Sequence, residues 1–182
     1  MRHFSPRRHL MNFFLQNSSV SNASSLSPRD TTAVLAIARR LQRAHEAGEA
    51  QTLLRGKNLG LLCEQGGSAD ATLFRQAAVE LGAHVAHVRP NLSTFRTSQE
   101  IHDMARLLGR LYDAVECQGL TPAQVQSLSK DAGVPVYDGL ASSTHATAPL
   151  AMLLLGIGPL ADRRRFVLQA MLVQTMTCHD KV

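Results

Sequence analysis

The sequence predicts an α/β fold: a single three-layer domain with a four-stranded parallel sheet flanked by helices. From residue 57 onward, short apolar runs alternate with longer segments of helical periodicity, as in consecutive βαβ units. The chain has 182 residues, of which 45% are hydrophobic, and this is enough for one buried core. Strands connected through helices form a parallel sheet that is covered on both faces.

The first 25 residues are expected to lie outside this domain, which spans residues 26–182. They show no sustained periodicity and end in a Ser/Asn cluster, so we predict a flexible, basic extension. The first helix then begins at Ser27-Pro28, an N-cap followed by proline at the first helical position. Apolar residues at helical spacing continue this helix until it ends near Gly48.

Strands and helices then alternate to the end of the chain. The predicted strands are residues 59–63, 84–88, 114–117 and 134–137. The predicted helices are residues 71–81, 99–111, 121–132, 147–155 and a final amphipathic helix over 160–177. A polar loop is expected at residues 91–98, and residues 156–159 predict a tight turn.

Composition argues against several functions. The formal net charge is +5, but three of those charges fall within the first ten residues, and aromatic residues make up only 4% of the chain. We therefore expect no nucleic-acid partner. No apolar run approaches the roughly 20 residues that a membrane span needs, so no membrane partner is expected.

The three cysteines are widely spaced and form no CxxC pair, which favours a reduced, cytoplasmic protein without a cofactor or metal. The Arg- and Ser-rich, acid-free start of the chain also fits an organelle transit peptide. That alternative stays open.

Several stretches resemble ornithine carbamoyltransferases in order and spacing. Residues 103–113 (DMARLLGRLYD) are similar to DTARVLGRMYD in that family, and residues 133–140 (GVPVYDGL) to GVPVWNGL. Residues 54–59 (LRGKNL) resemble the entry to the family's first strand, and His145 stands where the family has the His of its HPTQ motif. The resemblance covers roughly residues 26–155. It implies the fold of the family's carbamoyl-phosphate-binding domain.

The end of the chain resembles the family's last helix. Residues 162–176 (DRRRFVLQAMLVQTM) are similar to ENRMHTIKAVMVATL, which in the family returns from the second domain and packs on the first. The resemblance therefore implies that the ornithine-binding domain is absent. The alternative is an unrelated amphipathic helix. We expect Arg163, Arg164 and Arg165 on its solvated face, with an anion site there as the alternative.

The resemblance also implies where a ligand would bind. The family holds carbamoyl phosphate at a Ser-Thr-Arg-Thr turn, where backbone N–H groups, hydroxyls and a guanidinium face the dianion. That turn corresponds to residues 67–70, the family's Arg after the third strand to Gln118, and HPTQ to residues 145–148. The candidate substrate-binding residues are Gly67, Ser68, Asp70, Gln118, His145 and Thr147. No catalytic residue is predicted apart from a vestigial role for His145.

Two of these positions depart from the family in charge. Ala69 stands where the family has Arg, and Asp70 adds a carboxylate. One charge pair near 4 Å is worth about 4 kcal/mol at an effective dielectric constant of 20, so the changes weaken carbamoyl-phosphate binding on the order of a thousandfold. Asp70 is instead expected to cap the following helix.

Five residues fall at the carboxyl ends of the predicted strands, where ligands bind in open parallel sheets: Cys63, Glu64, Cys117, Gln118 and His145. The cysteines are expected in the core, with a soft-metal site or a reactive thiol pair as alternatives. His84 and His87 are expected to point to opposite faces of their strand.

The resemblance leaves three functions open. The preferred one is a non-catalytic, oligomeric or regulatory relative, which forms a trimer as the family's first domains do or associates with a genuine carbamoyltransferase. The second is a domain that binds a small molecule such as an amino acid or an anion. The third is a residual enzyme of arginine biosynthesis that makes citrulline from ornithine and carbamoyl phosphate. The first is preferred because fold-determining residues remain where ligand residues are lost.

Overall fold

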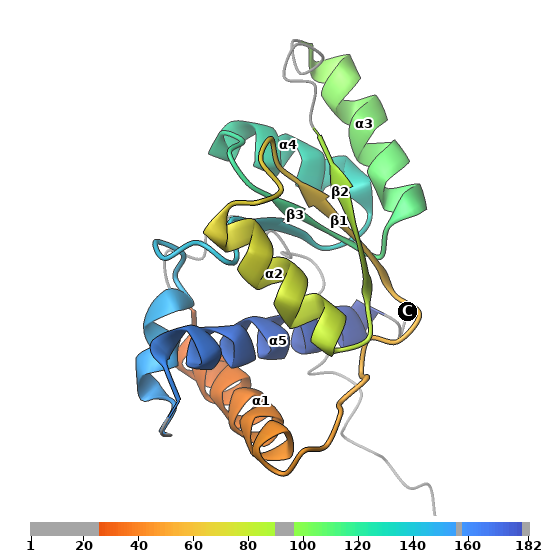
Figure 1. The fold of residues 1–182 in the computed structure, drawn as a ribbon. Coiled ribbons are helices and arrows are strands. Elements are labelled where there is room, and N and C mark those ends of the chain that lie inside the picture. The colour runs from red at the N-terminus through yellow and green to blue at the C-terminus, as the bar shows by residue number, and fades with distance from the viewer. Residues whose placement is uncertain (1–25, 90–96, 156–157, 180–182) are drawn as a thin grey trace, which may run out of the picture.

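A computed structural model of the chain describes residues 26–89, 97–155 and 158–179. For residues 178 and 179 it describes only the backbone. The predicted extension over 1–25 and most of the predicted loop over 91–98 lie outside the described residues. In chain order the elements are α1 (Pro28–Glu46), β1 (Asn58–Leu62), α2 (Ala69–Glu80), β2 (His84–Val88), α3 (Ser98–Leu111), β3 (Ala114–Cys117), α4 (Pro122–Ala132), β4 (Val136–Asp138), the 3₁₀ helix η2 (Ala148–Leu153) and α5 (Leu160–His179) (Figure 1).

The four strands form one parallel sheet in the order β2-β1-β3-β4. This confirms the predicted fold class. Side chains alternate between the two faces of the sheet, so each strand contributes to two separate apolar clusters. Leu59 and Leu61 of β1 lie in the first cluster, and Leu62 lies in the second. The sheet is therefore buried on both faces.

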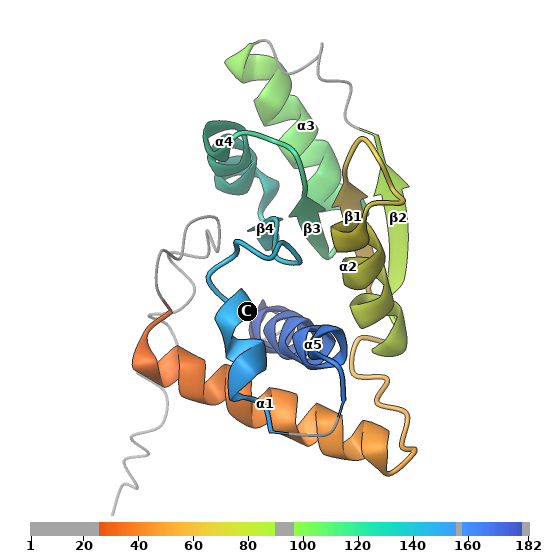
Figure 2. The ribbon, with the colours of Figure 1, turned by 60° about the vertical axis from the view of Figure 1, so that its left-hand side comes forward.

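Helices cover both faces. Helices α2 and α5 lie on one face of the sheet, and α3 and α4 lie on the other (Figure 2). Helix α1 packs on the outer side of α5, which places α5 between α1 and the sheet (Figure 2). No helix in the described ranges is long and apolar enough to cross a bilayer.

Local sequence explains the ends of the helices. Ser27 caps α1 by accepting a hydrogen bond from Asp30 N, and Thr97 and Thr121 each begin a helix with a reciprocal capping box. Helix α4 ends at Gly133, whose φ of 68° is readily adopted only by glycine. The predicted helix starts lie within about two residues of the observed ones.

Two predicted elements differ from the structure. Residues 148–153 form a 3₁₀ helix rather than the predicted α-helix. The fourth strand begins at Val136 rather than two residues earlier, since Pro135 has no N–H to donate to a ladder.

The prediction for the final helix is wrong in one important respect. Helix α5 is not amphipathic over its middle, because residues 164–172 are all buried. Arg164 is 7% exposed and Arg165 is 4% exposed, so these two residues do not lie on a solvated face. Arg165 forms an ion pair with Glu80 of α2 and stacks over the ring of Phe166 at 4.8 Å. The arginines are buried because α5 is enclosed between the sheet and α1.

Candidate functional site at the carboxyl edge of the sheet

The turn between β1 and α2 forms one side of the carboxyl edge. Ser68 is the N-cap of α2, and its hydroxyl accepts a hydrogen bond from Ala71 N at 3.1 Å. Asp70 follows two residues later in the first turn, where a carboxylate interacts favourably with the helix dipole. The predicted capping role therefore belongs to Ser68, and Asp70 contributes only its charge. Gly67 is exposed and precedes the cap.

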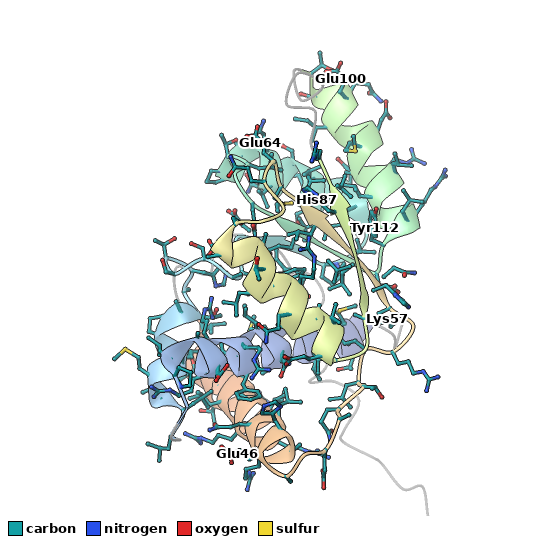
Figure 3. The ribbon with its side chains drawn as sticks, in the orientation of Figure 1. Glu46, Lys57, Glu64, His87, Glu100 and Tyr112 are labelled. Carbon is teal, nitrogen blue, oxygen red and sulfur yellow. The ribbon has the colours of Figure 1, made fainter. Side chains whose placement is uncertain are left out.

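The flank of this turn is closed by His87. A Cβ atom on Gly66 would lie 2.9 Å from the His87 ring, which explains the need for glycine. The His87 ring nitrogen Nε2 bonds to Cys63 O at 2.8 Å, and Arg75 donates weakly to Gly66 O at 3.4 Å. Glu64 is exposed just beyond β1 (Figure 3).

Arg164 is the centre of the opposite side. From α5 its guanidinium reaches the segment after β4 and donates to Leu140 O, to Ser142 O at 3.3 Å and to Thr147 Oγ1 at 2.9 Å. Burial lowers the pKa of Arg164 to about 10, while the charges of Glu116 and Asp70 oppose that shift. The side chain therefore stays charged at neutral pH.

Thr147 links Arg164 to His145 through hydrogen bonds. Thr147 N donates to His145 Nδ1 at 3.2 Å, so Nδ1 is an acceptor. The Thr147 hydroxyl lies 2.9 Å from the same nitrogen. Since that hydroxyl already accepts from Arg164, its own proton is directed to His145. This chain of hydrogen bonds holds the ring with Nδ1 facing Thr147.

Glu116 is a fully buried carboxyl group between these two sides. It is 0% exposed, and it accepts hydrogen bonds from Gln118 Nε2 and from Leu140 N, both at 3.2 Å. Burial raises the pKa of Glu116 to about 7, although these hydrogen bonds oppose the shift. Leu140 links it to the arginine, since its N–H bonds to Glu116 and its carbonyl to Arg164.

The structure thus brings most of the predicted site residues together. His145 and Thr147 are in direct contact, Gln118 bonds to Glu116, and the charge of Asp70 acts on Arg164. Glu116 and Arg164 were not among the site residues predicted from the sequence. A signal was present for the arginine, because it precedes the buried Val167 and Leu168 by three and four residues and so shares their face.

The two cysteines are core residues, as predicted. Cys63 belongs to the apolar cluster under α2 and α5, and Cys117 belongs to the cluster under α3 and α4. They lie on opposite faces of the sheet, which rules out a thiol pair. Burial raises the pKa of both thiols. Across residues 26–89, 97–155 and 158–179, no group of three His, Cys, Asp or Glu side chains is placed to hold a metal ion.

Comparison with known proteins identifies the relatives of this chain. Residues 18–155 match the family model described as "Aspartate/ornithine carbamoyltransferase, carbamoyl-P binding domain". The chain is 37% identical over 144 residues to an ornithine carbamoyltransferase of Actinobacillus pleuropneumoniae, which covers 79% of this chain and 43% of that protein. It is 36% identical over 137 residues to the catabolic ornithine carbamoyltransferase of Mycoplasma capricolum subsp. capripneumoniae, and this match covers 75% of this chain and 44% of that protein.

Solved structures agree. The ornithine carbamoyltransferase of Pyrococcus furiosus superposes with a TM-score of 0.55 at 27% identity, over 61% of this chain and 36% of that one. The aspartate transcarbamoylase of Trypanosoma cruzi shares the fold, with a TM-score of 0.61 at 23% identity. The match covers 73% of this chain and 42% of that one. The chain spans less than half of the length of the curated relatives described above.

Proposed function

This chain belongs to the aspartate/ornithine carbamoyltransferase family, and on that premise we propose that it is a non-catalytic relative that acts through assembly. The observation that carries the proposal is that the Arg164 guanidinium group already donates hydrogen bonds to protein oxygens. This buried guanidinium at the carboxyl edge already donates to Leu140 O, Ser142 O and Thr147 Oγ1. A dianion at the edge would have to compete with these protein oxygens.

The balance of charge at the edge supports the same conclusion. Three cations of the described edge, Arg75, Arg89 and Arg164, stand beside four carboxyl groups, those of Glu64, Asp70, Glu116 and Asp138. The site therefore has no excess positive charge when the carboxyl groups are ionised. Cationic groups strengthen phosphate binding through charge-assisted hydrogen bonds, so this balance of charge supports weak or absent binding of carbamoyl phosphate.

Exposed apolar side chains support assembly. Met152, Leu153 and Leu155 around η2 and Leu160 at the start of α5 are between 51% and 86% exposed. Several large apolar side chains exposed within one short stretch of chain favour a protein–protein contact. We propose a homo-oligomer, specifically a trimer, or association with a complete carbamoyltransferase, in the cytoplasm.

A second candidate function is binding of a small cationic or amino-acid ligand at the same edge. The carboxylates of Glu64 and Asp70 favour it, because both lie near the β1–α2 turn without an ion pair in the described residues. A thermal-shift series of amino acids, amines and anions tests this candidate. It is refuted if none of these compounds changes the melting temperature.

The assembly proposal is tested by two measurements on the purified chain. Citrulline formation from ornithine and carbamoyl phosphate should stay at the no-enzyme background, with a complete ornithine carbamoyltransferase as the positive control. Light scattering should give about 59 kDa, three copies of the 19.8 kDa chain, with and without carbamoyl phosphate. Turnover refutes the non-catalytic part. A monomer that also fails to bind a complete carbamoyltransferase refutes the assembly part.

A further inference from the structure

We propose that the groove between the C-terminal half of α1 and the start of α5 binds a small organic anion of the carboxylate or phosphate class. The groove has a volume of about 820 Å³ and is lined by residues of α1, by Leu155 and Gly158, and by the first residues of α5; α1 packs on the side of α5 that faces away from the sheet (Figure 2). It is separate from the carboxyl edge described above, and the proposal does not depend on the function assigned to that edge.

Three guanidinium groups converge on this groove from two helices. Arg39 and Arg43 are four residues apart and share one face of α1, and Arg163 enters from the first turn of α5. Within the described residues, none of these three has a carboxylate within 4.0 Å. Their charges are therefore not neutralised by the protein.

The acidic groups of the groove are already engaged. Glu46, at the end of α1 (Figure 3), accepts a hydrogen bond from Gln42 at 3.1 Å. Asp162 pairs with Arg165 at 3.4 Å. The described lining of the groove therefore carries four guanidinium groups against two carboxylates, which leaves an excess of positive charge.

Arg163 is held at the edge of the groove by a hydrogen bond. One of its terminal nitrogens donates to Leu154 O at 3.3 Å, which links its guanidinium group to the residue that follows η2. The N-terminal end of the 20-residue helix α5 adds a favourable dipole for an anion.

The rest of the groove indicates a ligand larger than a bare phosphate. Leu155 is 86% exposed beside it, and the ring of Phe166 lies against His45 with a centroid distance of 5.5 Å. An apolar wall next to a cationic cluster fits an anion that also carries a hydrocarbon or ring portion.

Isothermal titration calorimetry with citrate and with phenyl phosphate tests the proposal. We expect saturable binding of at least one probe at one site per chain. The double substitution Arg39→Gln with Arg43→Gln should weaken it at least about tenfold, since charged hydrogen bonds are lost, while the corresponding double Lys variant should retain most of the affinity. Both positions are exposed, so the fold should persist.

Two controls separate specific binding from general attraction. Arg40→Gln removes an exposed charge from the same helix but outside the groove, and it should leave the affinity within about twofold. Lys130→Gln removes an exposed charge from α4, on the other face of the sheet, and should also leave the affinity unchanged. The proposal is overturned if neither probe binds, if Arg40→Gln weakens binding as much as Arg39→Gln with Arg43→Gln does, or if Lys130→Gln abolishes binding.

Discussion

The buried carboxyl group of Glu116 makes the stability of the domain depend on pH. Burial raises its pKa from 4.5 to about 7 in the folded protein. Between these values the folded protein keeps a proton that the unfolded chain has released. The resulting stabilisation is complete below pH 4.5 and is lost as the pH rises through 7. At about 1.4 kcal/mol for each pKa unit, the loss is on the order of 3 kcal/mol.

The substitution Glu116→Gln isolates this effect, because the amide keeps the shape of the side chain and does not titrate. We expect the free energy of unfolding of the native chain to fall by about 3 kcal/mol relative to the variant between pH 4.5 and 8. Urea unfolding followed by far-UV circular dichroism at several pH values measures the difference. Other titrating groups, including Asp138, are common to both proteins and cancel to first order.

Glu64→Gln is the matched control, since it makes the same chemical change at an exposed carboxyl group. Parallel curves for the native chain and Glu116→Gln would refute the reasoning. That result would mean that Glu116 stays ionised in the fold, held by the nearby charge of Arg164.

Four further substitutions test the packing and the buried hydrogen bonds by urea unfolding. Arg164→Ala should cost about 3 kcal/mol, because Leu140 O, Ser142 O and Thr147 Oγ1 each lose a donor in a buried region; a loss below about 1 kcal/mol would contradict its central position. Gly109→Ala should cost about 3 kcal/mol, since the new Cβ would lie 1.8 Å from Ala132 O, whereas Gly67→Ala, with open space around it, should change stability by less than about 1 kcal/mol. Tyr137→Phe should cost about 1 kcal/mol, because the buried hydroxyl loses its hydrogen bond to α5; an unchanged midpoint would contradict this.

Much of the fold was predictable because local signals and the global fold agree. Caps at Ser27, Thr97 and Thr121 mark helix starts directly. Short apolar runs between helices predict a buried parallel sheet without further information. The 3₁₀ form of residues 148–153 was not predictable in this way, because periodicity alone does not separate one tight turn of helix from another.

The centre of the candidate site was harder to predict. Three consecutive arginines, residues 163–165, suggest a solvated surface, since arginine is seldom buried without partners. Those partners are Glu80, Leu140 and Thr147, which belong to other elements and are brought close only by the fold. Whether a charged side chain is buried in this way depends on the tertiary structure rather than on the local sequence.

Glu116 was closer to being predictable. It lies in β3, a strand of four residues that are all buried. Both faces of a central parallel strand are covered, so any carboxyl group within it must be buried whichever way it points. That rule identifies a buried acid before its partners are known.

We propose that this domain keeps the family's fold but does not hold carbamoyl phosphate. Calorimetric titration of freshly prepared carbamoyl phosphate into the purified chain at pH 7.5 tests it most directly, with a complete ornithine carbamoyltransferase as the positive control. We predict a dissociation constant weaker than about 1 mM, since the charge changes at the β1–α2 turn remove several kcal/mol of binding. A saturable isotherm in the micromolar range, lost in Ser68→Ala, would contradict the claim and show that the turn still binds the ligand.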